Sequence, residues 1–394
     1  MLVRAALLVP YMAAWAGSAY LPLPRTDLEI FFWPAADMGA AGQLLQAYAP
    51  GGQALYPDAN GPLSLLPLTA VEWVARTAGW LRDDHLHKAL TMVVFSLFLL
   101  LMAAGVVRAV ERLRGTRLSE VQRLLTVGVV VLAPPAWQAL AGFGHVEQPL
   151  EVLAVLIAAH AVASRRAVPA GIALGLAVLA RSPAVLFGIP LCLALVEGRR
   201  WRKGLLMSAV AVATVGAVMT PFLLADRADV LHSLVFYRGA LGVGAGSIWS
   251  LARDTEVGAL AQHLDVVLAA LLTVAISSWL ALAPGGLRGA SLFAALAAAA
   301  GTFALLGKAV WPYYFFEVYV FTAAWGLGRP GRLRTGLMAM AAVILMGLVA
   351  EVGSTNNLPD VQVRIEGTLM FVALGTFLAG LVTAARRDAR ATSG

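Results

Sequence analysis

Long apolar stretches separated by short clusters of basic residues run through the whole chain, and this alternation constrains its fold most. A helix that crosses a bilayer needs about 17–25 mostly apolar residues. Of the 394 residues, 60% are hydrophobic and only 13% are charged, whereas a soluble domain carries about 25% charged residues. The composition therefore excludes a soluble enzyme, a disordered chain and, with the single cysteine Cys192, a disulfide scaffold. We expect an all-α polytopic membrane protein.

Ten segments are candidates for such helices, and the stretch 168–197 is long enough for two further short helices, which makes twelve. Its break is expected at Arg181-Ser182-Pro183, because proline disfavours helical backbone in the residue before it. The first segment lacks a small-residue cleavage site, which favours a retained helix over a removed signal peptide. The predicted spans are 4–21, 88–108, 122–137, 149–164, the two within 168–197, 204–224, 264–283, 289–307, 312–328, 335–352 and 367–385. Together they make residues 1–394 a single integral membrane domain.

The distribution of charge predicts the orientation of these spans. Of the 29 Lys and Arg residues, 19 fall in the connections on one side, whereas 18 of the 22 acidic residues fall on the other. Basic connections face the cytoplasm, so we expect both termini inside, in the plasma membrane of a bacterial cell. The loops 21–87, 225–263, 138–148, 308–312 and 353–366 are then extracytoplasmic. Because loops on a rigid scaffold carry function, the active face is expected on that side.

Residues 62–80 in the first loop are apolar enough to suggest a further span. Such a span would move the Arg-rich connection 108–123 to the outside of the membrane. It would also place Glu72 and Arg76, which share one helical face, in the bilayer. We therefore predict an amphipathic helix on the outer membrane surface, and a second such helix over residues 35–49.

Three acidic residues, Asp27, Glu29 and Asp37, lie within eleven residues just after the first predicted span. A carboxylate beside an acceptor hydroxyl can act as a general base. The alternative interpretation is that these acids solvate the loop and cap the helix over 35–49.

Four further ionisable residues lie in or beside predicted spans. His145 and Glu147 have no further ligands nearby at a spacing that suits zinc, so we interpret them as polar residues that line a cavity. The acidic and histidine residues of 83–87 lie in a loop and are weak evidence for a metal site. Arg181 and Lys308 lie in apolar surroundings, where cations are costly and point to function. They either bind a lipid phosphate or extend to the lipid headgroups.

The second large loop has a Gly-rich stretch over 239–246. It lacks the βαβ context and the glycine spacing of a nucleotide-binding turn, so its glycines indicate loop flexibility. Arg238 and Trp249, on either side of this stretch, are candidates for lining a sugar or lipid-phosphate pocket.

These motifs, taken in order, resemble the GT-C superfamily of membrane glycosyltransferases and, within it, bacterial family-87 type mannosyltransferases. The motifs are Asp27-Leu28-Glu29 with Ala35-Ala36-Asp37, similar to D-L-x-x-Y-x-x-A-A; Leu55-Tyr56-Pro57 with Gly61-Pro62-Leu63, similar to L-Y…Y-P-P-L; Gly144-His145-Val146-Glu147; residues 171–181, similar to G-x-x-x-G-L-A-x-x-x-K; Arg238 with Ser247-Ile248-Trp249; and Lys308 with Trp311-Pro312-Tyr313-Tyr314. The resemblance covers residues 1–330, which would form the catalytic module, and leaves 331–394 as C-terminal helices.

The resemblance implies transfer of a mannose-like hexose, with inversion, from a polyprenyl-phosphate donor to an extracytoplasmic glycan or lipid acceptor. It implies Asp27 as the general base, with no cofactor, no metal ion and no nucleic acid. The residues it assigns to substrate binding are Glu29, Asp37, Tyr56, His145, Glu147, Arg181, Arg238, Trp249, Lys308 and Tyr313. A transporter or lipid-linked sugar flippase is the main alternative, although the two halves of the chain show no internal repeat. A non-catalytic assembly subunit is the third.

Overall fold

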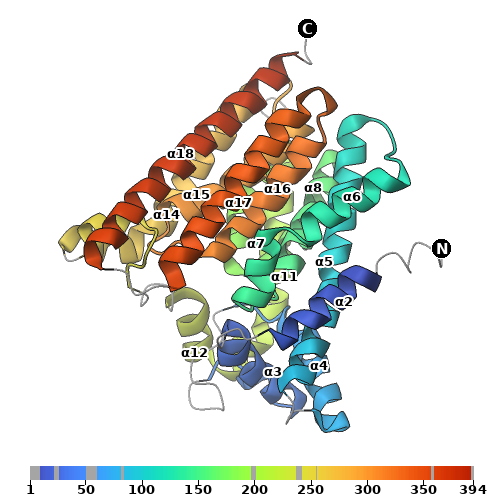
Figure 1. The fold of residues 1–394 in the computed structure, drawn as a ribbon, viewed down its shortest axis with the longest axis vertical. Helices are drawn as coiled ribbons and strands as arrows, with labels where there is room; N and C mark the ends of the chain where they lie inside the picture. Colours follow the sequence, from blue (N-terminus) through green and yellow to red (C-terminus); the bar gives the residue numbers. More distant parts are fainter. Residues whose placement is uncertain are drawn as a thin grey trace.

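A computed structural model describes the chain except for residues 1–8, 22–25, 50–59, 81–83, 197–200, 237–241, 254, 356–358 and 392–394. Every regular element in the described ranges is a helix, and those ranges contain no strand. The all-α prediction is therefore confirmed. The helices α5, α8 and α14–α18 run side by side as a bundle, and α3, α4 and α12 lie at one end of it (Figure 1).

Five of the described helices contain a segment that is long and apolar enough to cross a membrane. They are α5 (Asp84–Arg114), α11 (Arg202–Ala225), α14 (Glu256–Ala281), α17 (Leu333–Thr355) and α18 (Asp360–Ala391). A sixth candidate is the pair formed by α6 (Glu120–Val131) and the segment Pro134–Gly142, which is bent by 50°. The sequence predicted an unbroken span over 122–137, but Pro134 and Pro135 end the α6 geometry and start α7 (Pro134–Trp137), which continues into η5 (Gln138–Gly142).

The other predicted spans correspond to shorter helices, so the count of twelve crossings stays a prediction. These helices are α2 (Val9–Gly17), α8 (Gln148–Ala163), α9 (Ala167–Ala180), η6 (Ser182–Phe187), α10 (Gly188–Leu195), α15 (Ala290–Leu306) and α16 (Phe315–Leu327). The break between α9 and η6 falls at Arg181, whose backbone is extended (φ −154°, ψ 124°). That break was predicted from Pro183 and is confirmed.

Helices α15 and α16 form the centre of the bundle. Nearly every residue of α15 and of α16 is buried, which is typical of a helix surrounded by other helices. Helix α16 packs against α15 on one side and α17 on the other. Where α16 meets α17, a Cβ on Gly326 would lie 2.6 Å from the Cα of Gly336, so the two backbones approach as closely as only small residues permit.

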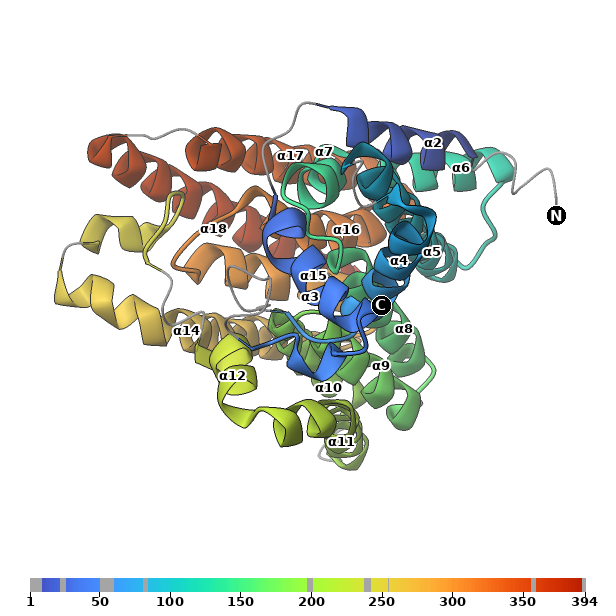
Figure 2. The ribbon, with the colours of Figure 1, turned by 90° about the horizontal axis from the view of Figure 1, so that it is seen from below.

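The end of the bundle that carries α3, α4 and α12 is built from short elements. In chain order these are η1 (Ser18–Tyr20), η2 (Leu28–Phe32), α3 (Trp33–Ala40), η3 (Leu44–Gln46), α4 (Leu65–Ala78), α12 (Arg227–Leu231), η7 (His232–Phe236), η8 (Ile248–Ala252) and η9 (Pro312–Tyr314), with η10 (Pro330–Arg332) placed elsewhere, after α16. Figure 2, seen from this end, shows α3 lying across the bundle with α4 beside it. Helix α4 buries Leu68 and Val71 but exposes Leu66 and Trp73. The single helix predicted over 35–49 is not found, because α3 ends at Ala40 and only the short η3 follows it, whereas α4 lies within the segment 62–80. The position of these helices on a membrane surface stays a prediction.

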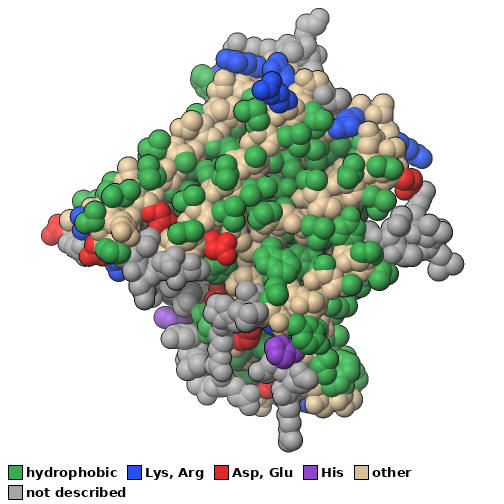
Figure 3. All heavy atoms as spheres, viewed as in Figure 1, with side chains coloured by type: hydrophobic (Ala, Val, Ile, Leu, Met, Phe, Trp, Pro, Cys, Tyr) green, Lys and Arg blue, Asp and Glu red, His purple; other side chains and the backbone are tan. Residues whose placement is uncertain are grey.

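Charge is distributed unevenly along the bundle. On the face in Figure 3, most Lys and Arg side chains gather at the end opposite α3 and α4, and most Asp, Glu and His side chains lie in the other half. Between them the surface is mainly apolar, with exposed leucines and valines on α11, α14, α17 and α18. This pattern is typical of a membrane protein, and we call the two ends the basic end and the acidic end.

Candidate functional site

The segment that carries Asp27 is held against the turn before α8. The Asp27 amide donates to the carbonyl of Phe143 at 3.0 Å. Gly144 follows with a positive φ of 76°, and a Cβ there would lie 2.6 Å from the amide nitrogen of Leu28. Only glycine therefore permits this close approach, which brings Asp27 beside His145 although 118 residues separate them.

Asp27, His145 and Glu147 form a row of charged side chains. The Asp27 Oδ2 lies 2.9 Å from His145 Nε2, as a close ion pair rather than an aligned hydrogen bond. On the other side of the ring, His145 Nδ1 donates to Glu147 Oε1 at 2.6 Å. The Asp27 side chain is 33% exposed, whereas His145 and Glu147 are buried. The row therefore leads from an accessible carboxylate into the protein interior.

The two carboxylates keep the His145 ring protonated at neutral pH. Burial disfavours the imidazolium, but the charges of Glu147 and Asp27 outweigh burial and raise the pKa of His145 to about 9. The Asp27 carboxylate therefore lies beside a cation, in a site that is only partly open to water.

Arg181 continues the row as the centre of a buried group of carboxylates. Its guanidinium lies 3.7 Å from Glu147 and 3.6 Å from Glu151, and it donates a hydrogen bond to Glu317. The break between α9 and η6 places the Arg181 side chain among these carboxylates, because the extended backbone at Arg181 changes the direction that a continuous helix would give it. Gln148 joins the group by donating to Glu317 at 3.0 Å.

Aromatic rings from η9, just before α16, close this group on one side. The Tyr313 ring lies 3.7 Å from the His145 ring, centroid to centroid. The Arg181 guanidinium lies 5.8 Å from the Tyr313 centroid and 5.4 Å from that of Tyr314, close enough for cation–π attraction. Of the residues predicted for the site, the structure thus brings together Asp27, His145, Glu147, Arg181 and Tyr313.

Glu29 and Asp37, also predicted for the site, have other partners. Glu29 accepts hydrogen bonds from Thr26 and, at 2.9 Å, from Lys88. Burial opposes ionisation of Glu29, but these bonds outweigh it and lower the pKa of Glu29. Asp37 pairs with Arg76 of α4 near the surface. Both acids therefore join the first loop segment to neighbouring helices.

Glu72, which shares one helical face with Arg76 in the sequence, does not pair with it. It is buried, and its Oε1 lies 2.8 Å from His87 Nε2 of α5. The His87 ring stacks on Trp33 of α3, with the centroids 3.9 Å apart. These contacts join α3, α4 and α5.

Lys308 and Trp249 belong to a second polar group at the acidic end. The Trp249 indole donates to the Leu306 carbonyl at 2.8 Å, and the buried Lys308 donates its backbone amide to Asp265 at 3.3 Å. Ser247 donates to the Gly307 carbonyl and so ties η8 to the end of α15. Tyr56 and Arg238 lie outside the described residues.

Glu151 and Glu317 were missed by the sequence reasoning although the sequence carries a signal for both. Each is an acid within an apolar stretch, and buried ionisable residues in membrane segments mark functional sites. Glu147 and Glu151 are also four residues apart, which places them on the same face at the start of α8.

The described part of the chain has no group of three or more His, Cys, Asp and Glu side chains arranged to hold a metal ion. The chemistry that the site offers is that of a carboxylate base, an imidazolium and a guanidinium. Comparison with models of protein families and with curated proteins found no match to this chain.

Proposed function

We propose that this protein is a glycosyltransferase of the GT-C type, which moves a mannose-like hexose from a polyprenyl-phosphate donor to an extracytoplasmic glycan or glycolipid. The observation that carries the proposal is the Asp27 carboxylate. It is partly exposed at the acidic end, and His145 holds it through an ion pair of 2.9 Å. A carboxylate fixed at the edge of a closed site is suited to deprotonate a hydroxyl group.

In the proposed reaction, Asp27 takes the proton of the acceptor hydroxyl while that oxygen attacks the anomeric carbon. The bond between this carbon and the phosphate oxygen breaks through an oxocarbenium-like transition state, with inversion at the carbon. The leaving group is a phosphate anion and needs no general acid. The His145 imidazolium orients Asp27 through its ion pair.

The other residues expected at the site take supporting roles in this proposal. Arg181 holds Glu147, Glu151 and Glu317 together and so fixes the turn that carries His145. Lys308 remains our candidate for binding the donor phosphate, since it lies at the same end of the bundle. The acidic end would then face the outside, with both termini and twelve crossings as predicted from the sequence.

Purified protein in detergent, incubated with a panel of labelled polyprenyl-phosphate sugars and glycan acceptors, tests the proposal. We expect label to move to an acceptor from one donor of the panel and not from a nucleotide sugar. Transfer from a nucleotide sugar, or no transfer with any lipid-linked donor, would contradict the proposal.

One observation favours a second candidate, a proton-coupled transporter or lipid-linked sugar flippase. The chain of ionisable groups from Asp27 to Glu317 enters the bundle, and such chains carry protons in transporters. Proteoliposomes with an imposed pH gradient distinguish the two functions. A transporter accumulates or flips the lipid-linked sugar without chemical change, whereas a glycosyltransferase consumes it without a gradient.

A further inference from the structure

A large cavity lies at the basic end of the described structure, far from Asp27 and His145. Its volume is about 1320 Å³, and it is lined mainly by α5, α8, the start of α15 with the loop before it, and the residues that follow α16. His160 lines it near the end of α8, whereas Glu147 precedes the start of α8. Thirteen residues of helix separate the two, which corresponds to about 20 Å along the axis.

Arginine dominates the polar lining of this cavity. Six arginines, namely Arg108, Arg112, Arg165, Arg288, Arg329 and Arg332, face one carboxylate, Asp388. Asp388 is already paired with Arg329 and lies 3.9 Å from Arg332. Arg165 donates to the carbonyl of Ala194 at 2.7 Å.

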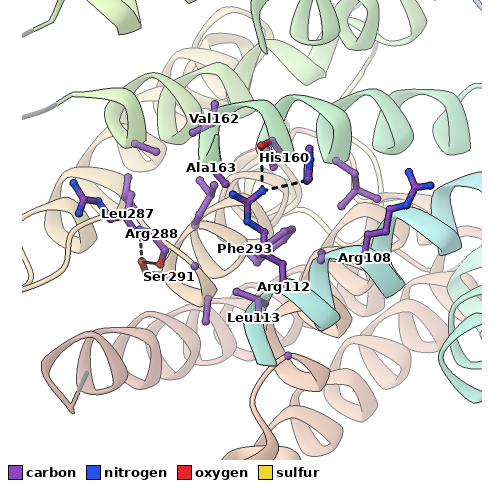
Figure 4. A pocket seen from close by; sticks show the side chains of 18 of the residues that line it. Arg108, Arg112, Leu113, His160, Val162, Ala163, Leu287, Arg288, Ser291 and Phe293 are labelled. Carbon is purple, nitrogen blue, oxygen red and sulfur yellow. Dashed lines mark hydrogen bonds between the residues drawn. The ribbon is translucent and has the colours of Figure 1, made fainter. Parts of the chain in front are cut away.

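The remaining three arginines have no carboxylate partner within the described residues. Arg112 donates to His160 Nδ1 at 3.2 Å, which requires a neutral imidazole because a guanidinium is always a donor. Figure 4 shows this contact beside Phe293, with Arg288 and Leu287 on one flank of the cavity and Arg108 on the other. The side chains of Arg108 and Arg288 are exposed. The cavity thus holds an excess of positive charge that the described part of the protein does not neutralise.

The walls of the cavity are apolar and reach the outer surface of the bundle. Leu156, Leu292 and Phe293 line its interior. Leu101 and Ile157 also line it, yet they are 55% and 51% exposed on the flanks of α5 and α8. A hydrocarbon chain can therefore enter the cavity sideways from a surrounding bilayer.

We propose that this cavity binds an anionic glycerophospholipid, with its phosphodiester at Arg112, between the flanking Arg108 and Arg288, and one acyl chain along Leu101 and Ile157. A phosphate oxygen accepts charge-assisted hydrogen bonds from guanidinium groups, and its charge relieves the repulsion among the arginines. The volume exceeds the about 300–1,000 Å³ of a small-molecule site, as a headgroup with part of a chain requires. This site is independent of the proposed function at the acidic end.

The test measures lipid binding to the purified full-length protein by native mass spectrometry and by thermal unfolding in detergent. Phosphatidylglycerol is compared with phosphatidylcholine, whose headgroup is neutral overall, and with dodecyl phosphate and inorganic phosphate. The variant is Arg112→Gln with Arg288→Gln, and the matched control is Arg334→Gln, an exposed arginine of α17 that does not line the cavity.

We expect phosphatidylglycerol to bind wild type and Arg334→Gln alike, and the double variant about tenfold or more weakly, as the loss of charge-assisted bonds predicts. Ile157→Trp keeps every arginine but narrows the lateral opening of the cavity. It should therefore weaken the binding of phosphatidylglycerol without changing the binding of inorganic phosphate. Equal binding of phosphatidylcholine, or unchanged affinity in both variants, would overturn the proposal. Tighter binding of dodecyl phosphate or inorganic phosphate than of phosphatidylglycerol would also overturn it, in favour of a monoester lipid or a free anion.

Discussion

At the scale of single residues, the two acids of the first loop segment differ in what surrounds them. Asp27 is 33% exposed and contacts the His145 ring, whereas Glu29 is committed to Thr26 and Lys88. A residue that must accept a proton from a substrate needs access to it. The geometry therefore favours Asp27 over Glu29 as the base.

Replacing Asp27 with Asn should lower kcat for sugar transfer by about 100-fold or more, the usual contribution of a general base. Asp37→Asn is the matched control, because Asp37 pairs with Arg76 outside the site, and it should retain most activity. The measurement is turnover with the active donor, together with thermal stability in detergent. Near-normal turnover of Asp27→Asn would remove this residue from the mechanism and leave Glu29 as the next candidate.

Stability should fall as the pH rises from 6.5 to 9, because of His145. Its pKa is raised to about 9 in the folded protein, so the stabilising charge is fully present below pH 6.5 and is lost as pH passes 9. A pKa that moves from 6.5 to about 9 corresponds to a stabilisation on the order of 3 kcal/mol. Thermal unfolding of wild type and His145→Gln between pH 6 and pH 10 tests this. The stability of His145→Gln should depend less on pH than that of wild type. An equal dependence on pH in both proteins would refute the role given to His145.

Replacing Arg181 with Gln should destabilise the protein by about 3–5 kcal/mol, since breaking a buried pair leaves charges uncompensated. Glu147, Glu151 and Glu317 would then share the interior without their common cation. Arg76→Gln is the control, because its partly exposed pair with Asp37 is worth at most about 1 kcal/mol. A variant Arg181→Gln of normal stability but raised donor KM would instead assign Arg181 to phosphate binding.

At the scale of helices, local signals in the sequence predicted the helical class and one break between helices, but not the contacts between the elements. Pro183 correctly marked the break at Arg181. The equally plain signal of Pro134-Pro135 was included in a continuous span, although it bends the chain by 50°. The meeting of Asp27 with His145 had no local signal, because it depends on how Gly144 packs against Leu28, and a sequence pattern does not contain that distance.

Helix α4 provides the test of which segments cross the membrane. In a Cys192→Ala background, Thr77→Cys on the exposed side of α4 should react with an impermeant thiol reagent added to intact cells. Arg117→Cys, which is exposed in the turn after α5, should react only after the membrane is disrupted. If both cysteines react in intact cells, or both only after disruption, then the predicted position of residues 62–80 or of the α5 span relative to the membrane is wrong.

At the scale of the whole molecule, the sequence anticipated the separation of charge that Figure 3 shows. Composition and the charge of the loops are enough to predict this separation, because charged residues are excluded from the hydrocarbon of the membrane and basic residues collect on one side of it. The basic cavity was not anticipated. Its arginines come from α5, the turn after α8, the loop before α15 and the residues that follow α16, and only the packing of these elements brings them together.

An even number of crossings places both termini on one side, and the excess of basic residues predicts that this side is the cytoplasm. A green fluorescent protein fused after residue 394 should therefore fluoresce, and alkaline phosphatase at the same point should be inactive in cells. A fusion at position 80 should show the opposite behaviour. An active phosphatase at the C-terminus would contradict the twelve-span topology.

The arrangement of partners around Arg181 also has a consequence for the order in which the chain enters a membrane during synthesis. Glu147 and Glu151 precede Arg181, so the hairpin of α8 and α9 contains both signs of charge as soon as it is made. Glu317 follows 136 residues later. A lone charged side chain at the centre of a bilayer costs about 2.5–3.5 kcal/mol to insert. In the predicted topology α8, α9 and α16 each cross the membrane, so the acid of α16 meets a cation that the earlier helices have already brought there.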